Sequence, residues 1–291
     1  MRFCLLLLFL AVVTAEPIRV MFLCGVHGRE YATVLVCQDI ERRLAATHQD
    51  RFAWKVIPEV NPDGISLARD QGKSCHRGNG RGVDLNRNWP PIRKNFDAES
   101  SWVPERKTWE VNPGDKPFSE AETRWIKKEI EQFKPHLLLE FHTGECAMLS
   151  PYQSVFVPPN NHREHMKFSH WLLHEQLGFK RNECKRGAGL TTLYQAVGTL
   201  MDYAYEVLEV PMVFIVETYS TPNITMRTKP TSDLDASECK AVFVPSDLDR
   251  YVQTWGKVAD ALLALPDNEY QLLKQWTRPV QPPGSRSQRA S

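Results

Sequence analysis

Three short apolar segments of this chain each lead into residues with ionisable side chains. In chain order they are 18–23, followed by His27 and Glu30; 137–141, followed by His142; and 212–216, followed by Glu217. Such segments, alternating with stretches of helical periodicity, are typical of strands in an α/β domain with a largely parallel sheet. Because function in open α/β sheets gathers at the carboxyl ends of the strands, we expect these four side chains to form one site.

The rest of the chain supplies helices, turns and one long irregular stretch. The helices that we expect span residues 31–47, 119–133, 161–177 and 246–265, and a further strand spans 54–60. Ser119 and Glu122 have the spacing of a capping box at the start of the second helix. Residues 64–118 are rich in Gly, Pro and Trp, which in a compact domain indicates a functional surface more often than a plain connection.

The spacing of His27 and Glu30 is suited to a metal. An imidazole and a carboxylate three residues apart on a tight turn can hold one zinc ion from two sides. Catalytic zinc usually takes three protein ligands and keeps a fourth position for water. His142 is the natural third ligand because it follows another strand. The simpler interpretation of the pair is a solvated His beside an ion-paired Glu.

Glu217 and the arginines of residues 76–89 supply the other chemistry. A carboxylate beside a zinc site can act as a general base, although an ion pair with Arg or Lys would also account for Glu217. Arg87, aided by Asn86, would hold an anionic end of a substrate because its guanidinium matches a carboxylate. Arg77 would stabilise an oxyanion. On composition alone, a solvated basic loop is the competing interpretation.

A second group of histidines lies on the helix expected at 161–177. These are His162, His165, His170 and His174, at spacings that could also bind a metal. No carboxylate clamp or set of arginines accompanies them, so we interpret the group as a surface helix.

Composition and charge limit the class of protein. The chain has 291 residues, a net charge of +1 and 42% hydrophobic residues, as in an ordinary globular protein. The small charge argues against nucleic acid or a membrane as a partner. Residues 1–15 have the pattern of a secretory signal peptide, which predicts a secreted protein or one of the secretory-pathway lumen. Residues 16–276 fit one domain, and 277–291 a disordered tail.

The cysteines and one sequon agree with the secretory route. Six cysteines remain after the signal peptide, and an even number in an oxidising compartment predicts disulfides. The sequence does not choose among the fifteen possible pairings. Asn223 begins an Asn-Ile-Thr glycosylation sequon.

Together these motifs resemble the zinc carboxypeptidases of the carboxypeptidase A type. The elements that carry the resemblance are His27-Gly-Arg-Glu30, Arg77 nine residues before Asn86, the run Gly82-Val-Asp-Leu-Asn-Arg-Asn-Trp89, His142, Leu193-Tyr194-Gln195-Ala196 with Asp202 eight residues after Tyr194, and Glu217. The resemblance extends over residues 18–265. It implies a single zinc ion, and a His/Glu/His ligand set is the one known for carboxypeptidase A.

The resemblance also implies a role for each matching residue. His27, Glu30 and His142 would bind zinc, Glu217 would be the general base and Arg77 would polarise the scissile carbonyl. The free carboxylate of the substrate would be held by Asn86, Arg87 and Tyr194, with Arg29 further from the scissile bond. Met201 would form the floor of the specificity pocket, with Leu149, Ala196, Ile215 and Gln153 nearby. An apolar floor favours apolar C-terminal residues.

The fold implied is an α/β/α sandwich around a mixed, mainly parallel sheet. Only residues 16–26 of the expected mature chain precede His27, so we expect the N-terminal edge elements of the family to be missing. The sequence therefore predicts a secreted, monomeric metallocarboxypeptidase acting on peptide or protein C-termini. Two alternatives stay open, namely an N-acyl amino acid deacylase and a peptide-binding pseudoenzyme.

Overall fold

The structure is a computed structural model that describes residues 16–47, 50–92, 111–221 and 234–277. The predicted signal peptide, the sequon at Asn223 and the predicted tail from residue 278 onward lie outside the described residues.

The described residues form one six-stranded sheet with the order β2-β1-β3-β6-β4-β5. Its strands are β1 (Ile18–Leu23), β2 (Phe52–Ile57), β3 (Leu137–His142), β4 (Cys146–Ser150), β5 (Lys185–Ala188) and β6 (Met212–Thr218). All neighbouring pairs are parallel except β4 and β6, which are antiparallel. The predicted mixed, mainly parallel sheet is confirmed.

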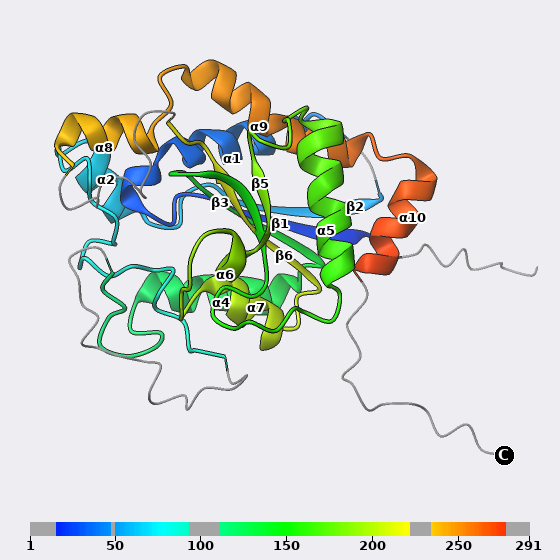
Figure 1. The fold of residues 1–291 in the computed structure, drawn as a ribbon, viewed down its shortest axis with the longest axis horizontal. Coiled ribbons are helices and arrows are strands. Elements are labelled where there is room, and N and C mark those ends of the chain that lie inside the picture. Colours follow the sequence, from blue (N-terminus) through cyan, green and yellow to red (C-terminus); the bar gives the residue numbers. More distant parts are fainter. Residues whose placement is uncertain (1–15, 48–49, 93–110, 222–233, 278–291) are drawn as a thin grey trace, which may run out of the picture.

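Helices cover both faces of this sheet (Figure 1). They are η1 (Gly28–Glu30), α1 (Ala32–Ala45), α2 (Pro62–Arg69), α4 (Ala121–Phe133), α5 (His162–His170), the π-helix η3 (Trp171–Gln176), α6 (Gly189–Thr192), α7 (Leu200–Glu206), α8 (Ala236–Phe243), α9 (Leu248–Leu263) and α10 (Asp267–Trp276). In the view of Figure 1, α1, α8 and α9 lie above the sheet and α4, α6 and α7 lie below it.

The two layers follow from the alternation of side chains along the buried strands. Val20 and Phe22 of β1 pack in a core with α1, α5, α9 and α10. Met21 and Leu23 point to the other face and pack with α4 and α7. Successive residues of a strand face opposite sides, so a strand covered on both faces must be apolar throughout. This explains the uninterrupted apolar runs in the sequence.

The register of the central strands brings the predicted site residues together. β3 and β6 run parallel, and His142 of β3 lies opposite Glu217 of β6. β1 is the other neighbour of β3, and the turn that holds His27 and Glu30 follows it. Three carboxyl strand ends therefore meet at one edge of the sheet, as the sequence predicts.

The structure corrects the predicted capping box. The N-cap of α4 is Glu120, and its side chain makes no capping hydrogen bond. Asn88 takes this role from outside the helix, since its Oδ1 accepts from the Glu120 N–H at 3.2 Å. A capping box is present instead at α8, between Asp235 and Glu238.

The helix predicted at 246–265 is confirmed to within two residues at each end, but it is not the last one. Residues 246–265 contain α9, and a further helix, α10, follows it after Pro266. The helix predicted at 161–177 is divided into α5 and the π-helical η3. Strands β4 and β5 are not among the predicted elements. β5 reads Lys-Arg-Gly-Ala, which carries no alternation of apolar and polar residues.

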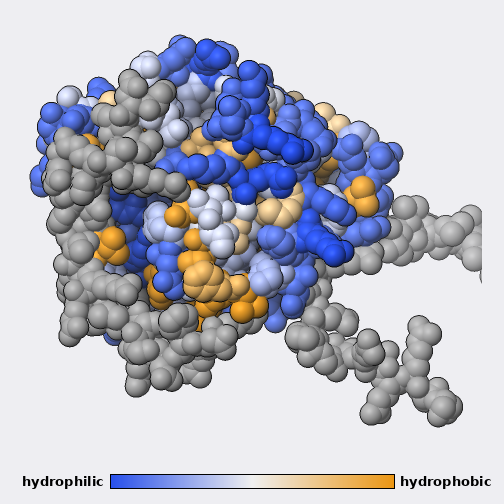
Figure 2. All heavy atoms as spheres, in the orientation of Figure 1, coloured by the Kyte–Doolittle hydropathy of each residue, from blue (hydrophilic) through white to orange (hydrophobic). Residues whose placement is uncertain are grey.

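Three disulfides connect the elements, as the even number of cysteines predicts. They join Cys24 to Cys37, Cys75 to Cys239, and Cys146 to Cys184. The second disulfide ties the loop before Arg77 to α8. Within the described part of the chain, no helix combines the length and the apolar character needed to cross a bilayer. Figure 2 shows a hydrophilic surface with apolar side chains gathered over α6 and α7.

Candidate metal centre and active site

The side chains of His27, Glu30 and His142 converge on one point. Each offers a ligand atom, and these atoms lie within 4.8 Å of one another. The Nδ1 atoms of the two histidines are 3.1 Å apart. Glu30 faces both, with Oε1 2.9 Å from Nδ1 of His27 and Oε2 2.8 Å from Nδ1 of His142. Two imidazole nitrogens and a carboxylate in this arrangement fit a zinc ion.

The turn that carries this group is held by close backbone packing. A Cβ on Gly28 would lie 2.2 Å from the carbonyl oxygen of Gly64, so only glycine fits there. The Gly28 N–H donates to the carbonyl of Arg77 at 2.9 Å. The metal turn and the loop of Arg77 are therefore fixed to each other through the main chain.

A carboxylate lies close to the Nε2 atom of each histidine. Nε2 of His27 lies 3.0 Å from Oδ1 of Asp84, and Nε2 of His142 lies 3.2 Å from Oε1 of Glu140. A hydrogen bond from one ring nitrogen fixes the tautomer and leaves the other nitrogen free to bind a metal. Asp84 therefore directs the Nδ1 lone pair of His27 toward Glu30, and Glu140 lies at ion-pair distance from the far side of the His142 ring.

The charges in the centre are strongly coupled. Burial opposes the charge of Glu30, but His27 and His142 outweigh it and hold the pKa of Glu30 well below its ordinary value. Burial also opposes a charge on His142, yet Glu140 and Glu30 raise its pKa well above the ordinary value. The Glu30 carboxylate is thus ionised, which a zinc ligand requires.

Glu217 lies beside this centre at the end of β6. Burial, helped by the negative charges of Glu30 and Glu145, raises the pKa of its carboxyl group to about 8, against the opposing effects of His142 and Arg77. Its Oε2 is buried and has no hydrogen-bond partner among the described residues. A carboxyl group in such surroundings can accept and release a proton near neutral pH.

Arg77 is oriented by two carboxylates. Its Nε donates to Oδ2 of Asp84 at 2.7 Å, and its Nη1 donates to Oε1 of Glu30 at 3.4 Å. Burial disfavours its charge, but Asp84 and Glu30 outweigh this and raise the pKa of the guanidinium. Arg77 is therefore a fixed positive charge at the edge of the metal centre.

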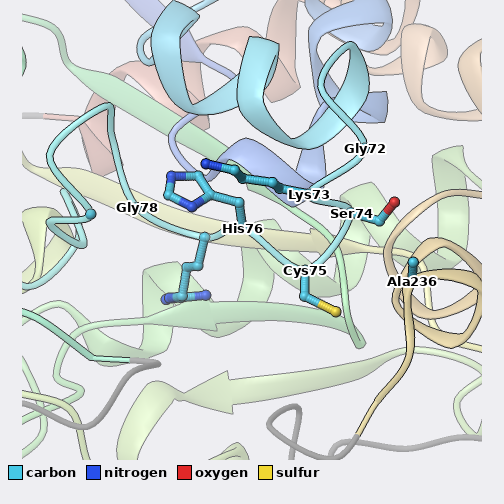
Figure 3. Close-up of a pocket in the computed structure, with 9 residues that line it drawn as sticks. Gly72, Lys73, Ser74, Cys75, His76, Gly78 and Ala236 are labelled. Carbon is cyan, nitrogen blue, oxygen red and sulfur yellow. The ribbon is translucent and has the colours of Figure 1, made fainter.

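A pocket of about 410 Å³ adjoins Arg77. It is bounded by the loop 72–78, Gly82 and Ala236 at the start of α8. Figure 3 shows the Lys73 and His76 side chains together on this loop and the Cys75 sulfur directed toward Ala236. Arg77 is the one predicted site residue among those that line this pocket.

The predicted carboxylate clamp is partly assembled. Nη2 of Arg87 lies 3.4 Å from the hydroxyl of Tyr194, which is half-exposed. Nδ2 of Asn86 lies 3.5 Å from Nε2 of His142, and its Oδ1 accepts from the N–H of Leu200 at 2.9 Å. Asn86 thus connects the clamp to the metal centre and to the start of α7.

Arg29 and Met201 are both buried. The guanidinium of Arg29 lies 4.2 Å from the centre of the Phe243 ring. The Arg29 side chain therefore packs against α8. Its contact with substrate stays a prediction. Met201 is fully buried on α7 among apolar side chains that include Leu149 and Ile215. Its role as pocket floor also stays a prediction.

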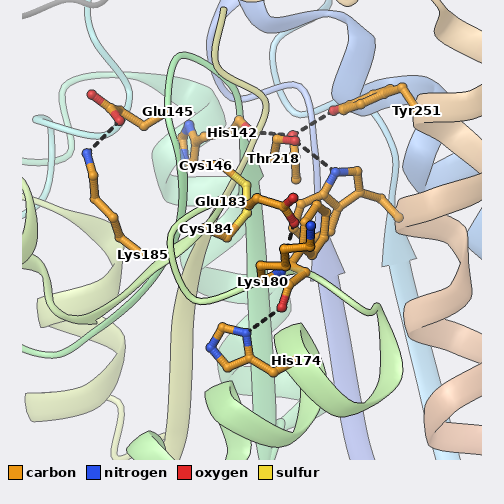
Figure 4. Close-up of a disulfide and its surroundings, with 12 residues drawn as sticks. His142, Glu145, Cys146, His174, Lys180, Glu183, Cys184, Lys185, Thr218 and Tyr251 are labelled. Atoms are coloured by element: carbon orange, nitrogen blue, oxygen red, sulfur yellow. Dashed lines mark hydrogen bonds and ion pairs between the residues drawn. A yellow bond between two sulfur atoms is a disulfide. The ribbon is translucent and has the colours of Figure 1, made fainter. Parts of the chain in front are cut away.

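The edge of the site near Glu217 carries an ion pair. Nζ of Lys185 lies 2.9 Å from Oε2 of Glu145, directly beside the Cys146–Cys184 disulfide (Figure 4). At the end of β6, the hydroxyl of Thr218 donates to the carbonyl of His142 at 2.7 Å and contacts the hydroxyl of Tyr251. The backbone of His142 is therefore held in place from α9.

The histidines near α5 do not form a second metal centre. His165 is fully buried and contacts the carbonyl of Asn161 through Nδ1 at 3.1 Å. His174 contacts the carbonyl of Phe179 through Nδ1 at 2.7 Å. In the described ranges, the only group suited to a metal is His27, Glu30 and His142. His162, His170 and His174 are partly exposed, whereas the burial of His165 shows that the predicted surface helix also faces the core.

Asp84 and Glu140 are site residues that the sequence analysis missed. Asp84 lies in the Gly82–Trp89 run, two residues before Asn86, and Glu140 is the one charged residue inside the apolar strand β3. A buried carboxylate needs a partner, and His142 follows Glu140 at the spacing that puts both on one face of the strand. That spacing was the available signal for Glu140.

Known proteins were compared with the chain by sequence and by fold. A family model described as zinc carboxypeptidase matches residues 14–240. A zinc carboxypeptidase of Simulium vittatum is 24% identical over 214 residues, covering 68% of this chain and 69% of that protein. Mast cell carboxypeptidase A of Mus musculus is 25% identical over 205 residues, covering 63% of this chain and 47% of its own length.

The fold agrees with these matches. The crystal structure of the carboxypeptidase A from Helicoverpa armigera aligns with a TM-score of 0.62 at 21% identity. The alignment covers 86% of this chain and 62% of that one. The chain spans about half the length of several curated relatives that it matches.

Proposed function

The chain belongs to the zinc carboxypeptidase family, and from this premise we propose that it is an exopeptidase that hydrolyses the C-terminal peptide bond of peptides or proteins. The observation that carries the proposal is the meeting of His27, Glu30 and His142 within 4.8 Å, with both Nδ1 atoms directed at Glu30. A bound zinc ion would supply Lewis-acid chemistry, polarising a carbonyl and making a water molecule more acidic.

Glu217 would move the proton in this reaction. Its ionised carboxylate would take a proton from the attacking water and deliver it to the leaving amine. The raised pKa of Glu217 and the unpartnered Oε2 support this role. Arg77 would stabilise the negative charge that develops on the carbonyl oxygen, because its guanidinium stays charged and is held by Asp84.

The clamp would select peptides with a free carboxylate. Arg87 would pair with that carboxylate, and Asn86 would donate an amide hydrogen bond to it. Tyr194 is half-exposed and near Arg87, which suits a side chain that closes over a bound end. Met201 would bound the space for the last side chain, which favours an uncharged residue because burying a charge without a partner is costly.

Compartment and assembly form part of the same proposal. The three disulfides support an oxidising compartment such as the secretory pathway. We propose that the protein acts as a monomer on peptide or protein C-termini. N-acyl amino acid deacylation and peptide binding without turnover are the alternatives.

The test is release of C-terminal amino acids from peptides by the purified protein. We expect release to stop with a chelator, to return with zinc, and to fall by at least about a thousandfold in Glu217→Gln with zinc still bound. C-terminally amidated peptides serve as the matched control because they lack the carboxylate that Arg87 would hold. Cleavage of N-acyl amino acids without cleavage of peptides would favour the deacylase instead.

A further inference from the structure

Gln153 presents a buried side-chain amide with an unused oxygen. The residue is 3% exposed, and its Oε1 has no hydrogen-bond partner in the described part of the structure. A buried polar group without a partner costs about 1–3 kcal/mol. Such a group in a folded protein calls for an explanation, and a ligand that completes the hydrogen bond is one.

The position of this amide is defined by its neighbours. A Cβ placed on Gly189 would lie 3.0 Å from Cγ of Gln153 and 3.3 Å from Cε of Met201. Gln153, in the segment after β4, and Met201, in α7, therefore both contact Gly189. Because Gly189 has no side chain, its main chain can lie close against both of them.

The backbone of Gln153 is held on both sides. Its N–H donates to Oδ1 of Asp202 at 2.9 Å, and its carbonyl accepts from the N–H of Ala196 at 3.0 Å. Ala196 lies two residues after Tyr194, so the chain that carries Tyr194 is attached to Gln153. The amide is thereby fixed next to the segment proposed to close over a bound C-terminus.

We propose that Gln153 is a specificity-determining residue and that the site takes substrates whose C-terminal residue ends in a neutral amide, namely asparagine or glutamine. The inference rests on the proposed exopeptidase function, in which Met201 bounds the space for the last side chain. An amide offers one acceptor and two donors, so two amides can exchange hydrogen bonds face to face. Met201 contributes apolar contact to the methylene part of the same side chain.

Other side chains fit this position less well. A leucine or methionine would leave the Gln153 amide without a partner in the complex, and sites with buried polar groups discriminate strongly against analogues that cannot bond them. A lysine or arginine would bring a charge beside Met201. The nearest carboxylate defined by these contacts, Asp202, already accepts from Gln153 and from the N–H and hydroxyl of Ser154.

The test uses peptides that differ only in a nearly isosteric last residue. The pairs are Asn against Leu and Gln against Met, so each compares an amide with an apolar group of similar size. For the wild type we expect kcat/KM to be at least about tenfold higher for the amide member of each pair. In Gln153→Met we expect the preference to disappear or reverse. Gln195→Met is the matched control, because the Gln195 amide is already bonded to the carbonyl of Ser154.

A binding measurement separates this inference from the proposed function. Affinities of the same peptides for zinc-loaded Glu217→Gln are measured by calorimetry. An amide preference in binding without turnover by the wild type would support the inference and overturn the exopeptidase. Turnover with a preference for Leu and Met that Gln153→Met leaves unchanged would overturn the inference and support the exopeptidase. A preference for Lys or Arg would also overturn it.

Discussion

Nε2 of His27 lies 3.0 Å from Oδ1 of Asp84, and the other oxygen of the same carboxylate accepts from Nε of Arg77 at 2.7 Å. One side chain thus orients a metal ligand and the proposed oxyanion-stabilising group. Burial opposes ionisation of Asp84, but Arg77 and His27 outweigh it and hold the pKa of Asp84 well below its ordinary value. Asp84 is therefore a charged link between the metal centre and the substrate side of the site.

Replacing Asp84 with Asn should weaken zinc binding by about 10- to 100-fold, the usual effect of removing a carboxylate behind a metal-binding histidine. The amide also cannot accept from His27 and Arg77 at the same time. Competition with a coloured chelator measures the zinc affinity. Asp249→Asn on the exposed surface of α9 is the control, and equal affinity in both variants would contradict the role of Asp84.

The ion pair between Glu145 and Lys185 should tune the acid limb of the pH profile. Burial is the main cause that raises the pKa of Glu217 to about 8, and the negative charge of Glu145 contributes to the same rise. The proposed reaction needs the ionised form of Glu217. We therefore expect kcat/KM to rise as the pH increases through the pKa that Glu217 has in the zinc-loaded protein. Zinc adds positive charge and lowers that pKa without changing the direction of the Glu145 effect.

Two variants should therefore shift the acid limb in opposite directions. Glu145→Gln removes a negative charge and leaves Lys185, so the limb should move to lower pH by roughly half a unit. Lys185→Met leaves Glu145 uncompensated, so the limb should move to higher pH. Profiles of kcat/KM between pH 4 and 9 measure this, and shifts of the same sign would contradict the account.

Much of the fold was predictable because it rests on patterns confined to single segments. β1, β3 and β6 are mostly apolar because both of their faces are covered, and their polar ends mark the carboxyl edge of the sheet. The convergence of His27, Glu30 and His142 followed from that edge. β5 was not predictable, because an edge strand with the sequence Lys-Arg-Gly-Ala is held by its pairing with β4.

The errors came from contacts between distant residues. Ser119 has the local signature of a cap, yet the N-cap is Glu120, and its N–H donates to Asn88, which is distant in sequence. Glu140 reads as an interruption of an apolar strand until His142 is seen 3.2 Å away. The pairing of cysteines such as Cys75 and Cys239 is fixed by the fold and has no signal in their spacing.

His165 should make the protein less stable in mild acid. Burial lowers its pKa to about 4, against the opposing effect of the hydrogen bond to the Asn161 carbonyl. The unfolded chain, with an ordinary His pKa of about 6.5, binds more protons between these values. The free energy of unfolding should thus fall as the pH drops from about 6.5 to 4, by up to about 3 kcal/mol.

The His165 effect is isolated by the slope of stability against pH. In His165→Gln, melting temperature should depend less on pH between 6.5 and 4 than in the wild type, whatever its value at neutral pH. His162→Gln, on the same helix but partly exposed, is the control. An unchanged slope in His165→Gln would assign the acid sensitivity to other groups.

The Cys75–Cys239 disulfide should support both stability and catalysis. It closes a loop over a sequence separation of 164 residues and lies two positions before Arg77. The double variant Cys75→Ala with Cys239→Ala should lose about 3–5 kcal/mol of stability, measured by denaturant unfolding. It should also lower kcat more than it raises KM, because Arg77 would be less well placed against the developing charge. If kcat is unchanged in the folded double variant, the disulfide contributes to stability and has no role in placing Arg77.

The most direct test of the account is a crystal structure of zinc-loaded protein with anomalous data collected at the zinc absorption edge. We expect one strong peak, bound by Nδ1 of His27, Nδ1 of His142 and the carboxylate of Glu30, with Glu217 beside it. A zinc ion bound elsewhere, for example by the histidines of α5, with no peak at this centre, would contradict the account.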